Sequence, residues 1–133
     1  MRVGDHALFF AGDTGYHPEF GAIGERYGPF DIVLVPIGAY DPRWFMRPVH
    51  MDPEEAVRAY LEVSAGSPES PGQPRPLPVA LGIHWGTFKL TDEPMDEPPK
   101  RALAAWRAAG LPEKDLWILK HGETRELRLP RHS

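Results

Sequence analysis

The sequence predicts an α/β fold, because short apolar runs alternate with segments of helical spacing along a chain of domain size. The chain has 133 residues, a length that suits one domain. Apolar runs at 7–11, 32–35 and 79–83 have the length and composition of buried strands. Segments with helical periodicity lie between and after these runs, and this alternation is typical of a layered sheet with helices.

The first half of the chain is predicted to form a strand, a helix and a second strand. The strand at 7–11 ends at a Gly-Asp pair. Apolar side chains then recur at helical spacing over 18–27, and the Gly-Pro pair at 28–29 is a typical helix stop. The second strand, at 32–35, ends at a proline.

A long aromatic loop is expected at 36–51, followed by a well-marked helix start. Asp52 is a good N-cap, and Pro53 suits the first helical position. Glu55 stands three residues after the cap, which is the spacing of a capping box. We therefore expect the helix to begin at these residues.

The second half is predicted to continue the alternation. We expect a solvated Pro-rich loop (65–78), a third strand (79–83), an acidic loop (92–99), a helix (99–109) and two final strands (116–119 and 124–129). Leu103 and Trp106 are expected on the inner face of the last helix. The predicted order of elements is therefore β-α-β-α-β-α-β-β.

The composition excludes several kinds of site and partner. The formal net charge is −4, so we expect no nucleic-acid partner, because such binders are normally basic. The sequence has no cysteine, which excludes disulfides, thiol nucleophiles and thiolate metal sites. No apolar run reaches the roughly 18 residues that a membrane span needs, and the first residues lack a signal-peptide layout. We therefore expect a cytoplasmic protein.

Polar residues that follow the predicted strands are the candidate site. In open α/β sheets, ligands bind in the crevice at the carboxyl ends of the strands. Asp13 and His84 follow two strands, His50 ends the loop after another, and His121 follows a later strand. Asp13 either forms an Asx turn or ligates a metal, and each histidine is either structural or functional. A carboxylate with an imidazole suits zinc, although zinc normally takes three or four protein ligands.

The aromatic loop has two interpretations. Its side chains either pack the loop or form an apolar and cationic wall for a ligand with a phosphate and apolar chains. The candidate substrate-binding residues are Tyr40, Arg43, Trp44, Phe45 and Met46. His50, which follows them, is a candidate general acid or base, or a phosphate contact.

Several motifs in register point to a known family. They are GDTGY (12–16), YGPFDIVLVPIGAYDPRWFM (27–46), HMDPEEA (50–56), IHWGTF (83–88), EPP (97–99) and KHGE (120–123). This series resembles the C-terminal half of N-acyl-phosphatidylethanolamine phospholipase D and its bacterial relatives, in the metallo-β-lactamase-fold superfamily. The resemblance covers nearly all of the chain except 65–78, which looks like a loop insertion.

The resemblance implies a zinc hydrolase with an αββα sandwich. Residues 1–133 would form the C-terminal half of that domain, with one mixed sheet and helices on one face. The family's site holds two zinc ions, with Asp13 matching the bridging aspartate and His84 a terminal ligand. His50 matches a histidine that supports catalysis. The implied activity is cleavage of the phosphodiester in N-acyl-phosphatidylethanolamine-type lipids, with the aromatic loop against the substrate.

The sequence also departs from the family pattern, because it lacks the motif His-x-His-x-Asp-His. We therefore expect at most a partial zinc site and little activity from this chain alone. An exposed apolar sheet face would favour association, so the expected partners are the missing N-terminal half or a second copy as a homodimer. The lipid substrate implies peripheral contact with a membrane. Two alternatives remain: a sugar-phosphate lactonase of the same fold, or a non-catalytic truncated or partner module.

Overall fold

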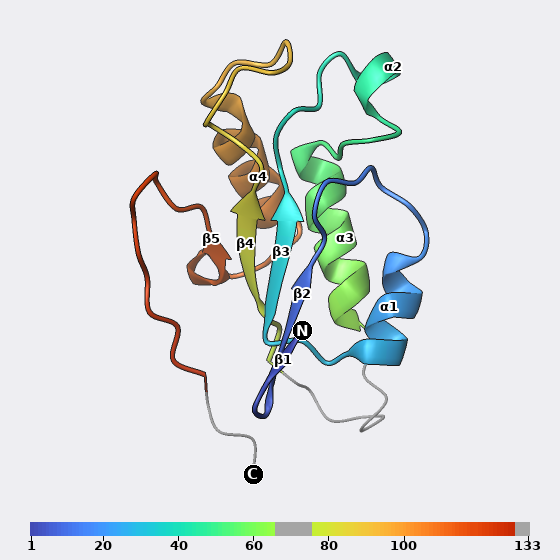
Figure 1. Ribbon diagram of the computed structural model, residues 1–133, viewed down its shortest axis with the longest axis vertical. Helices are drawn as coiled ribbons and strands as arrows, with labels where there is room; N and C mark the ends of the chain where they lie inside the picture. The colour runs from blue at the N-terminus through green and yellow to red at the C-terminus, as the bar shows by residue number, and fades with distance from the viewer. Residues whose placement is uncertain (66–75, 130–133) are drawn as a thin grey trace.

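The fold is α/β, with one mixed sheet and helices packed against one of its faces (Figure 1). The computed structural model describes residues 1–65 and 76–129. Most of the predicted Pro-rich insertion at 65–78 therefore lies outside the described residues. None of the helices in the described ranges is both long and apolar enough to cross a membrane.

The sheet has five strands in the spatial order β1-β2-β3-β4-β5. Their bounds are β1 (Arg2–Val3), β2 (His6–Phe10), β3 (Ile32–Pro36), β4 (Val79–Ile83) and β5 (Leu116–Trp117). Strands β2 to β5 run parallel, and β1 pairs antiparallel with β2. The carboxyl ends of β2, β3 and β4 therefore meet at one edge of the sheet, at the top of Figure 1.

The helices confirm the predicted alternation. Their bounds are α1 (Phe20–Tyr27), α2 (Arg43–Met46), α3 (Pro53–Ala65) and α4 (Glu97–Ala108), with a short 3-10 turn η1 (Glu113–Asp115). The predicted capping box forms at the start of α3. Asp52 Oδ1 accepts the N–H of Glu55 at 2.8 Å, and Glu55 Oε1 accepts the N–H of Asp52 at 3.2 Å. Two of the unpaired donors at this helix end are thereby satisfied.

The core lies between the sheet and the layer formed by α1, α3 and α4. Alternate strand residues such as Val33, Val35 and Ala80 point into it and are buried. Trp106 of α4 is 1% exposed, and its ring packs 4.7 Å from that of Tyr60 on α3. Both rings also satisfy their polar atoms, since Tyr60 donates to the carbonyl of Pro78 at 2.6 Å and Trp106 to that of Pro112 at 2.8 Å.

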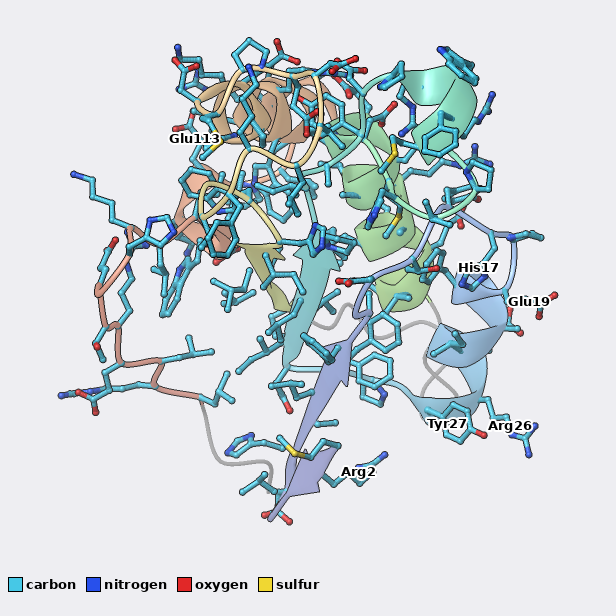
Figure 2. All side chains as sticks on the ribbon, turned by 45° about the horizontal axis from the view of Figure 1, so that its top comes forward. Arg2, His17, Glu19, Arg26, Tyr27 and Glu113 are labelled. Atoms are coloured by element: carbon cyan, nitrogen blue, oxygen red, sulfur yellow. The ribbon has the colours of Figure 1, made fainter. Side chains whose placement is uncertain are left out.

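The opposite face of the sheet carries apolar side chains that are more exposed. Phe10, Leu34, Leu81 and Trp117 are register partners across four neighbouring strands, so they form one row on this face. Phe10 is 61% exposed, and the other three are half-buried. At the β2 edge of the sheet, toward α1, a hollow of about 540 Å³ is lined by residues that include Phe9, Ile23 and Tyr27. In Figure 2, Tyr27 and Arg26 are labelled at the C-terminal end of α1.

The structure differs from the sequence prediction at four places. The loop after β3 contains the one-turn helix α2, and the chain begins with the short strand β1. The strand predicted at 124–129 does not form, and that predicted at 116–119 shortens to β5. After β5, the chain leaves the sheet (Figure 1). The alternating side chains of 124–129 thus have no neighbouring strand in the described residues, and a strand needs one to satisfy its backbone groups.

Candidate active site

The structure brings three of the predicted site residues together at the carboxyl edge of the sheet. Asp13 follows β2, His84 follows β4, and His50 precedes α3. The Oδ1 atom of Asp13 lies 3.3 Å from Nε2 of His84. The imidazole of His50 stacks on that of His84, with 4.9 Å between ring centroids and 27° between ring planes. The convergence predicted from the strand ends is therefore confirmed, while the roles of the three residues stay predictions.

Two glycines allow the segments that carry these residues to approach closely. A Cβ atom on Gly38 would lie 2.2 Å from the carbonyl oxygen of His84, so the chain after β3 presses against the backbone of the histidine. A Cβ atom on Gly15 would lie 2.6 Å from the carbonyl oxygen of Arg47. His84 itself has a positive φ of 62°, an uncommon conformation for a residue with a side chain. The site is thus built by tight backbone packing as well as by its side chains.

The electrostatic surroundings favour neutral His50. Burial lowers the pKa of His50 below its usual value, and the neighbouring His84 acts in the same direction. Asp13 and Glu93 oppose this shift through their negative charge. In the described residues, the buried Nδ1 atoms of His50 and His84 have no hydrogen-bond partner. A neutral imidazole with a free nitrogen can accept a proton or ligate a metal.

Asp13 and His84 fit two positions of a divalent metal site. They offer a carboxylate oxygen and an imidazole nitrogen, which are the donor types that zinc and related metals take. The side chain of Asp13 is 66% exposed and that of His84 is 21% exposed, so the pair is open to the outside. Within 1–65 and 76–129, no group of three or more potential ligands gathers around one point. Within the described residues, the pair by itself therefore does not complete a metal site.

The predicted substrate wall separates into two groups. Trp44 and Phe45 on α2 are 84% and 65% exposed, and Met46 beside them is half-buried. Tyr40 is fully buried, and its hydroxyl donates to Glu97 at 2.7 Å. The guanidinium of Arg43 turns toward the protein, where it contacts backbone carbonyls of its own loop and two carboxylates at the start of α3. Trp44 and Phe45 thus form the surface of this loop, while Tyr40 and Arg43 contact the body of the protein.

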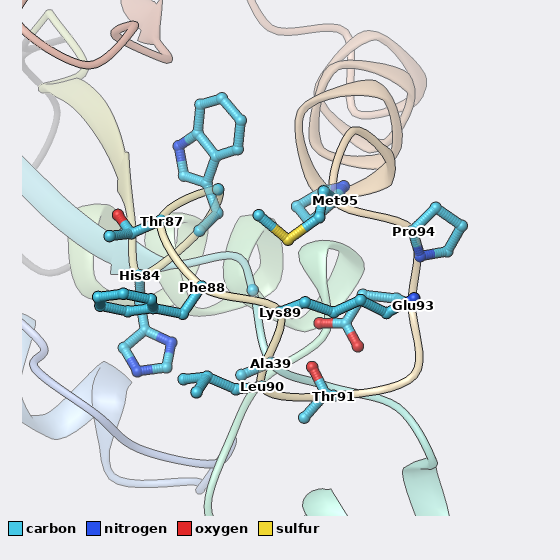
Figure 3. Close-up of a pocket in the computed structure, with 14 residues that line it drawn as sticks. Ala39, His84, Thr87, Phe88, Lys89, Leu90, Thr91, Glu93, Pro94 and Met95 are labelled. Atoms are coloured by element: carbon cyan, nitrogen blue, oxygen red, sulfur yellow. The ribbon is translucent and has the colours of Figure 1, made fainter.

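A pocket beside His84 was not found by sequence reasoning. It has a volume of about 340 Å³, within the range of ligand sites. Figure 3 shows it bordered by the segment from His84 to Met95, with Phe88, Leu90 and Met95 among the apolar side chains. Phe88 and Leu90 are 74% and 69% exposed. The available signal was the aromatic and apolar composition of the residues directly after His84, in a segment with no helical or strand periodicity.

A buried carboxylate connects this pocket to the loop after β3. Glu93 is 6% exposed, and its two oxygens accept the backbone N–H groups of Tyr40 at 3.0 Å and Asp41 at 3.2 Å. Burial alone would raise the pKa of Glu93, but hydrogen bonds from Thr91 and these backbone groups hold it below its usual value. Sequence reasoning missed this residue because it stands in an acidic stretch that has the composition of a solvated loop. His121 contacts the segment that follows His84, with its Nε2 atom 3.0 Å from Thr87 Oγ1.

Comparison with known proteins gives a family match. The family model for the beta-lactamase superfamily domain matches residues 1–69. An uncharacterized protein of Mycobacterium tuberculosis is 48% identical over 102 residues, which is 76% of this chain. N-acyl-phosphatidylethanolamine-hydrolyzing phospholipase D 1 of Caenorhabditis elegans is 43% identical over 90 residues, or 66% of this chain. A UPF0173 metal-dependent hydrolase of Aeropyrum pernix is 32% identical over 124 residues, or 93% of this chain.

These relatives are considerably longer than the chain. The matched region spans 24% of the mycobacterial protein, 22% of the nematode protein and 40% of the archaeal protein. The chain therefore corresponds to a part of each relative.

Proposed function

The chain belongs to the beta-lactamase superfamily, and we propose that it forms part of a metal-dependent hydrolase that cleaves the phosphodiester of N-acyl-phosphatidylethanolamine-type lipids. The observation that carries this proposal is the contact between Asp13 and His84, with His50 stacked on the histidine. Three residues from distant parts of the sequence place a carboxylate and two imidazoles at the ligand-binding edge of a parallel sheet. The names of two relatives, a phospholipase D and a metal-dependent hydrolase, support the same reaction class.

Asp13 and His84 would hold a divalent metal, for which we propose zinc. Such a metal, when bound, lowers the pKa of water and neutralises negative charge on a phosphodiester. Asp13 contributes a negative charge that favours the cation, and His84 contributes Nε2 on the same side. Partial burial lowers the pKa of His50, which favours the neutral imidazole, and its Nδ1 atom is enclosed. We assign to its Nε2 atom the transfer of a proton to or from the reacting group.

The remaining metal ligands would come from outside the described residues. We propose that they belong to a segment with the family's His-x-His-x-Asp-His motif or to a second copy of this chain. The row of Phe10, Leu34, Leu81 and Trp117 offers such a partner an apolar surface on the sheet face without helices. Binding there would remove apolar area from water, which is the main driving force of association.

The lipid would approach from the same edge of the sheet. The exposed side chains of Trp44 and Phe45 on α2, and of Phe88 and Leu90 beside the pocket, belong to the two loops that leave this edge. Large exposed apolar side chains in one region mark sites of interaction with proteins, ligands or membranes. We propose that these four contact acyl chains, while the pocket beside His84 receives an apolar part of the substrate.

The experiment measures metal and activity in the protein purified natively, so that any associated chain remains bound. We expect bound zinc by elemental analysis, and hydrolysis of N-acyl-phosphatidylethanolamine vesicles but not of a sugar-phosphate lactone. Asp13→Asn and His84→Ala should each reduce bound zinc and lower the rate by about 10²-fold or more. Trp44→Ala combined with Phe45→Ala should raise KM on vesicles and leave bound zinc unchanged.

Each arm of this experiment has an outcome that contradicts the proposal. Full zinc and full activity in Asp13→Asn would exclude the aspartate as a ligand. Lactone hydrolysis without lipid hydrolysis would replace the substrate class. No bound zinc and no hydrolysis in the natively purified protein would favour a non-catalytic module.

A further inference from the structure

The side chain of Arg43 closes the loop that carries His50. It leaves the first turn of α2 and folds back toward the body of the protein. Its Nη1 atom donates to the carbonyl of Tyr40 at 3.3 Å and to the carbonyl of His50 at 3.1 Å. One guanidinium nitrogen therefore links the carbonyl of Tyr40, at the start of the loop, to the carbonyl of His50 at its end.

The other side of the same guanidinium contacts the N-terminus of α3. Nη2 forms an ion pair with Glu55, and Nε lies 3.6 Å from Oδ2 of Asp52. These two carboxylates also form the capping box, so their positions are fixed by the helix backbone. The side chain of Arg43 is 27% exposed, which limits the competition of water for these contacts.

These contacts use the fork geometry that distinguishes arginine from lysine. A guanidinium presents five donors in a rigid plane, whereas an ammonium is a compact charge on a flexible stem. The planar guanidinium of Arg43 contacts two carbonyls and two carboxylates at the same time. Its donors thus face the protein, which differs from the substrate contact predicted for it from the sequence.

We infer that Arg43 is a positioning residue, which fixes the backbone of His50 to the α3 N-terminus and so sets the His50 imidazole against His84. The chain of contacts runs from the Asp52–Glu55 capping box through the guanidinium to the His50 carbonyl. It ends at the stacked rings, whose centroids are 4.9 Å apart. The consequence for catalysis rests on the role proposed above for His50, but the placement of the ring does not.

The first test measures the ring contact in the full chain by NMR. Arg43→Gln removes the charge and the fork, and Arg43→Lys keeps the charge alone. We expect the cross-relaxation signal between the His50 and His84 ring protons to be lost in Arg43→Gln and weakened in Arg43→Lys. Arg107→Gln is the matched control, because it removes an arginine–glutamate pair with Glu113 outside the site. It should leave the signal unchanged.

Circular dichroism verifies that each variant is folded. If Arg43→Gln does not fold, Glu55→Gln is used, since it weakens the same contact from the other side. An unchanged ring signal in whichever of these variants is folded would overturn the inference.

The second test measures kcat and KM separately for lipid hydrolysis by the natively purified protein. A positioning role predicts that kcat falls in Arg43→Gln by about 10- to 100-fold, since small misplacements of reacting groups have effects of this size. KM should stay within about twofold, and Arg43→Lys should recover part of kcat. A raised KM with kcat and the ring signal unchanged would instead make Arg43 a substrate contact.

The two tests separate this inference from the proposed function. If Arg43→Gln displaces the His50 ring while the natively purified protein neither binds zinc nor hydrolyses lipid, the positioning role stands and the proposed function fails. If Asp13→Asn abolishes zinc binding and hydrolysis while Arg43→Gln changes neither the ring contact nor kcat, the proposed function stands and the inference fails.

Discussion

The two faces of the sheet are built from the same strands but differ in what covers them. On the helix-covered face, Val33 and Ala80 are fully buried. On the other face, Phe10 is 61% exposed and Leu34 and Leu81 are half-buried. Because side chains alternate along a strand, each strand contributes to both faces. The core on the helix-covered face therefore stabilises the chain, while in the described residues the apolar row on the other face stays partly exposed.

The candidate site lies at the carboxyl edge of the sheet. Contacts on the helix-covered side hold its segments in place. Arg43 donates to the carbonyl of His50 and pairs with Glu55 at the start of α3. Glu93, in the segment beside the pocket, accepts two backbone N–H groups of the chain after β3. None of these contacts involves a side chain on the sheet face without helices, here called the open face. The placement of His50 and of the pocket segment should therefore depend on the helix layer. Three substitutions test this difference between the faces.

The largest effect is expected in the core of the helix-covered face. Trp106→Ala removes a ring that is 1% exposed, packs on Tyr60 and donates to the carbonyl of Pro112. We expect the free energy of unfolding to fall by about 3–5 kcal/mol in urea denaturation. Trp44→Ala is the matched control, because Trp44 is 84% exposed and its loss should change stability by about 0.5 kcal/mol or less. Equal effects of the two substitutions would contradict the assigned core.

A smaller effect, dependent on pH, is expected at the buried carboxylate. Glu93→Gln weakens two hydrogen bonds to backbone N–H groups, and should lower the free energy of unfolding by roughly 1–3 kcal/mol at neutral pH. The pKa of Glu93 is lowered in the folded state relative to its ordinary value of 4.5. The folded protein therefore binds fewer protons at this site than the unfolded chain does, and the stabilisation is present above about pH 4.5.

As the pH falls through the lowered pKa of Glu93, that stabilisation should disappear. Chemical denaturation of both proteins between pH 3 and pH 7 measures the difference between them. Burial raises the pKa of Asp41, and the negative charge of Glu93 raises it further, so part of the measured pH dependence comes from this neighbouring carboxylate. A difference between wild type and Glu93→Gln that stays constant across this range would show that the carboxylate charge has no part in the stabilisation.

The smallest effect on stability is expected on the open face. Phe10→Ser should change the free energy of unfolding by about 0.5 kcal/mol or less, since the side chain is 61% exposed. The same substitution should weaken association, because it removes the most exposed member of the apolar row. Sedimentation velocity on wild type and variant measures this. A large loss of stability in the monomer would mean that the open face contributes to the core.

The elements that could be predicted from the sequence are those with local causes. The capping box at Asp52 and Glu55 needs residues three positions apart, and strand β4 is an isolated apolar run, so both were predicted correctly. Strand β1 and the absent strand at 124–129 depend on what lies beside them in space. Alternating composition alone contains no such information.

The site divides in the same way. Asp13, His50 and His84 were predicted because they stand next to strand ends and helix starts, where chain topology alone brings side chains together. The burial of Tyr40 and the role of Glu93 arise from contacts between residues more than 50 positions apart. No local pattern distinguishes Glu93 from its acidic neighbours, and the pocket beside His84 exists only once its segment has folded back.

The left-handed backbone of His84 has a consequence for protein engineering. The close packing of Gly38 fixes the backbone at this position independently of the side chain that it carries. Asparagine and aspartate are the other residue types, besides histidine and glycine, that enter this region of backbone space most readily. At position 84, the imidazole nitrogen of histidine can therefore be replaced by the side-chain oxygen of asparagine or aspartate with little backbone strain. If His84 ligates a metal as proposed, exchanging that donor should shift the preference toward harder cations such as magnesium or manganese.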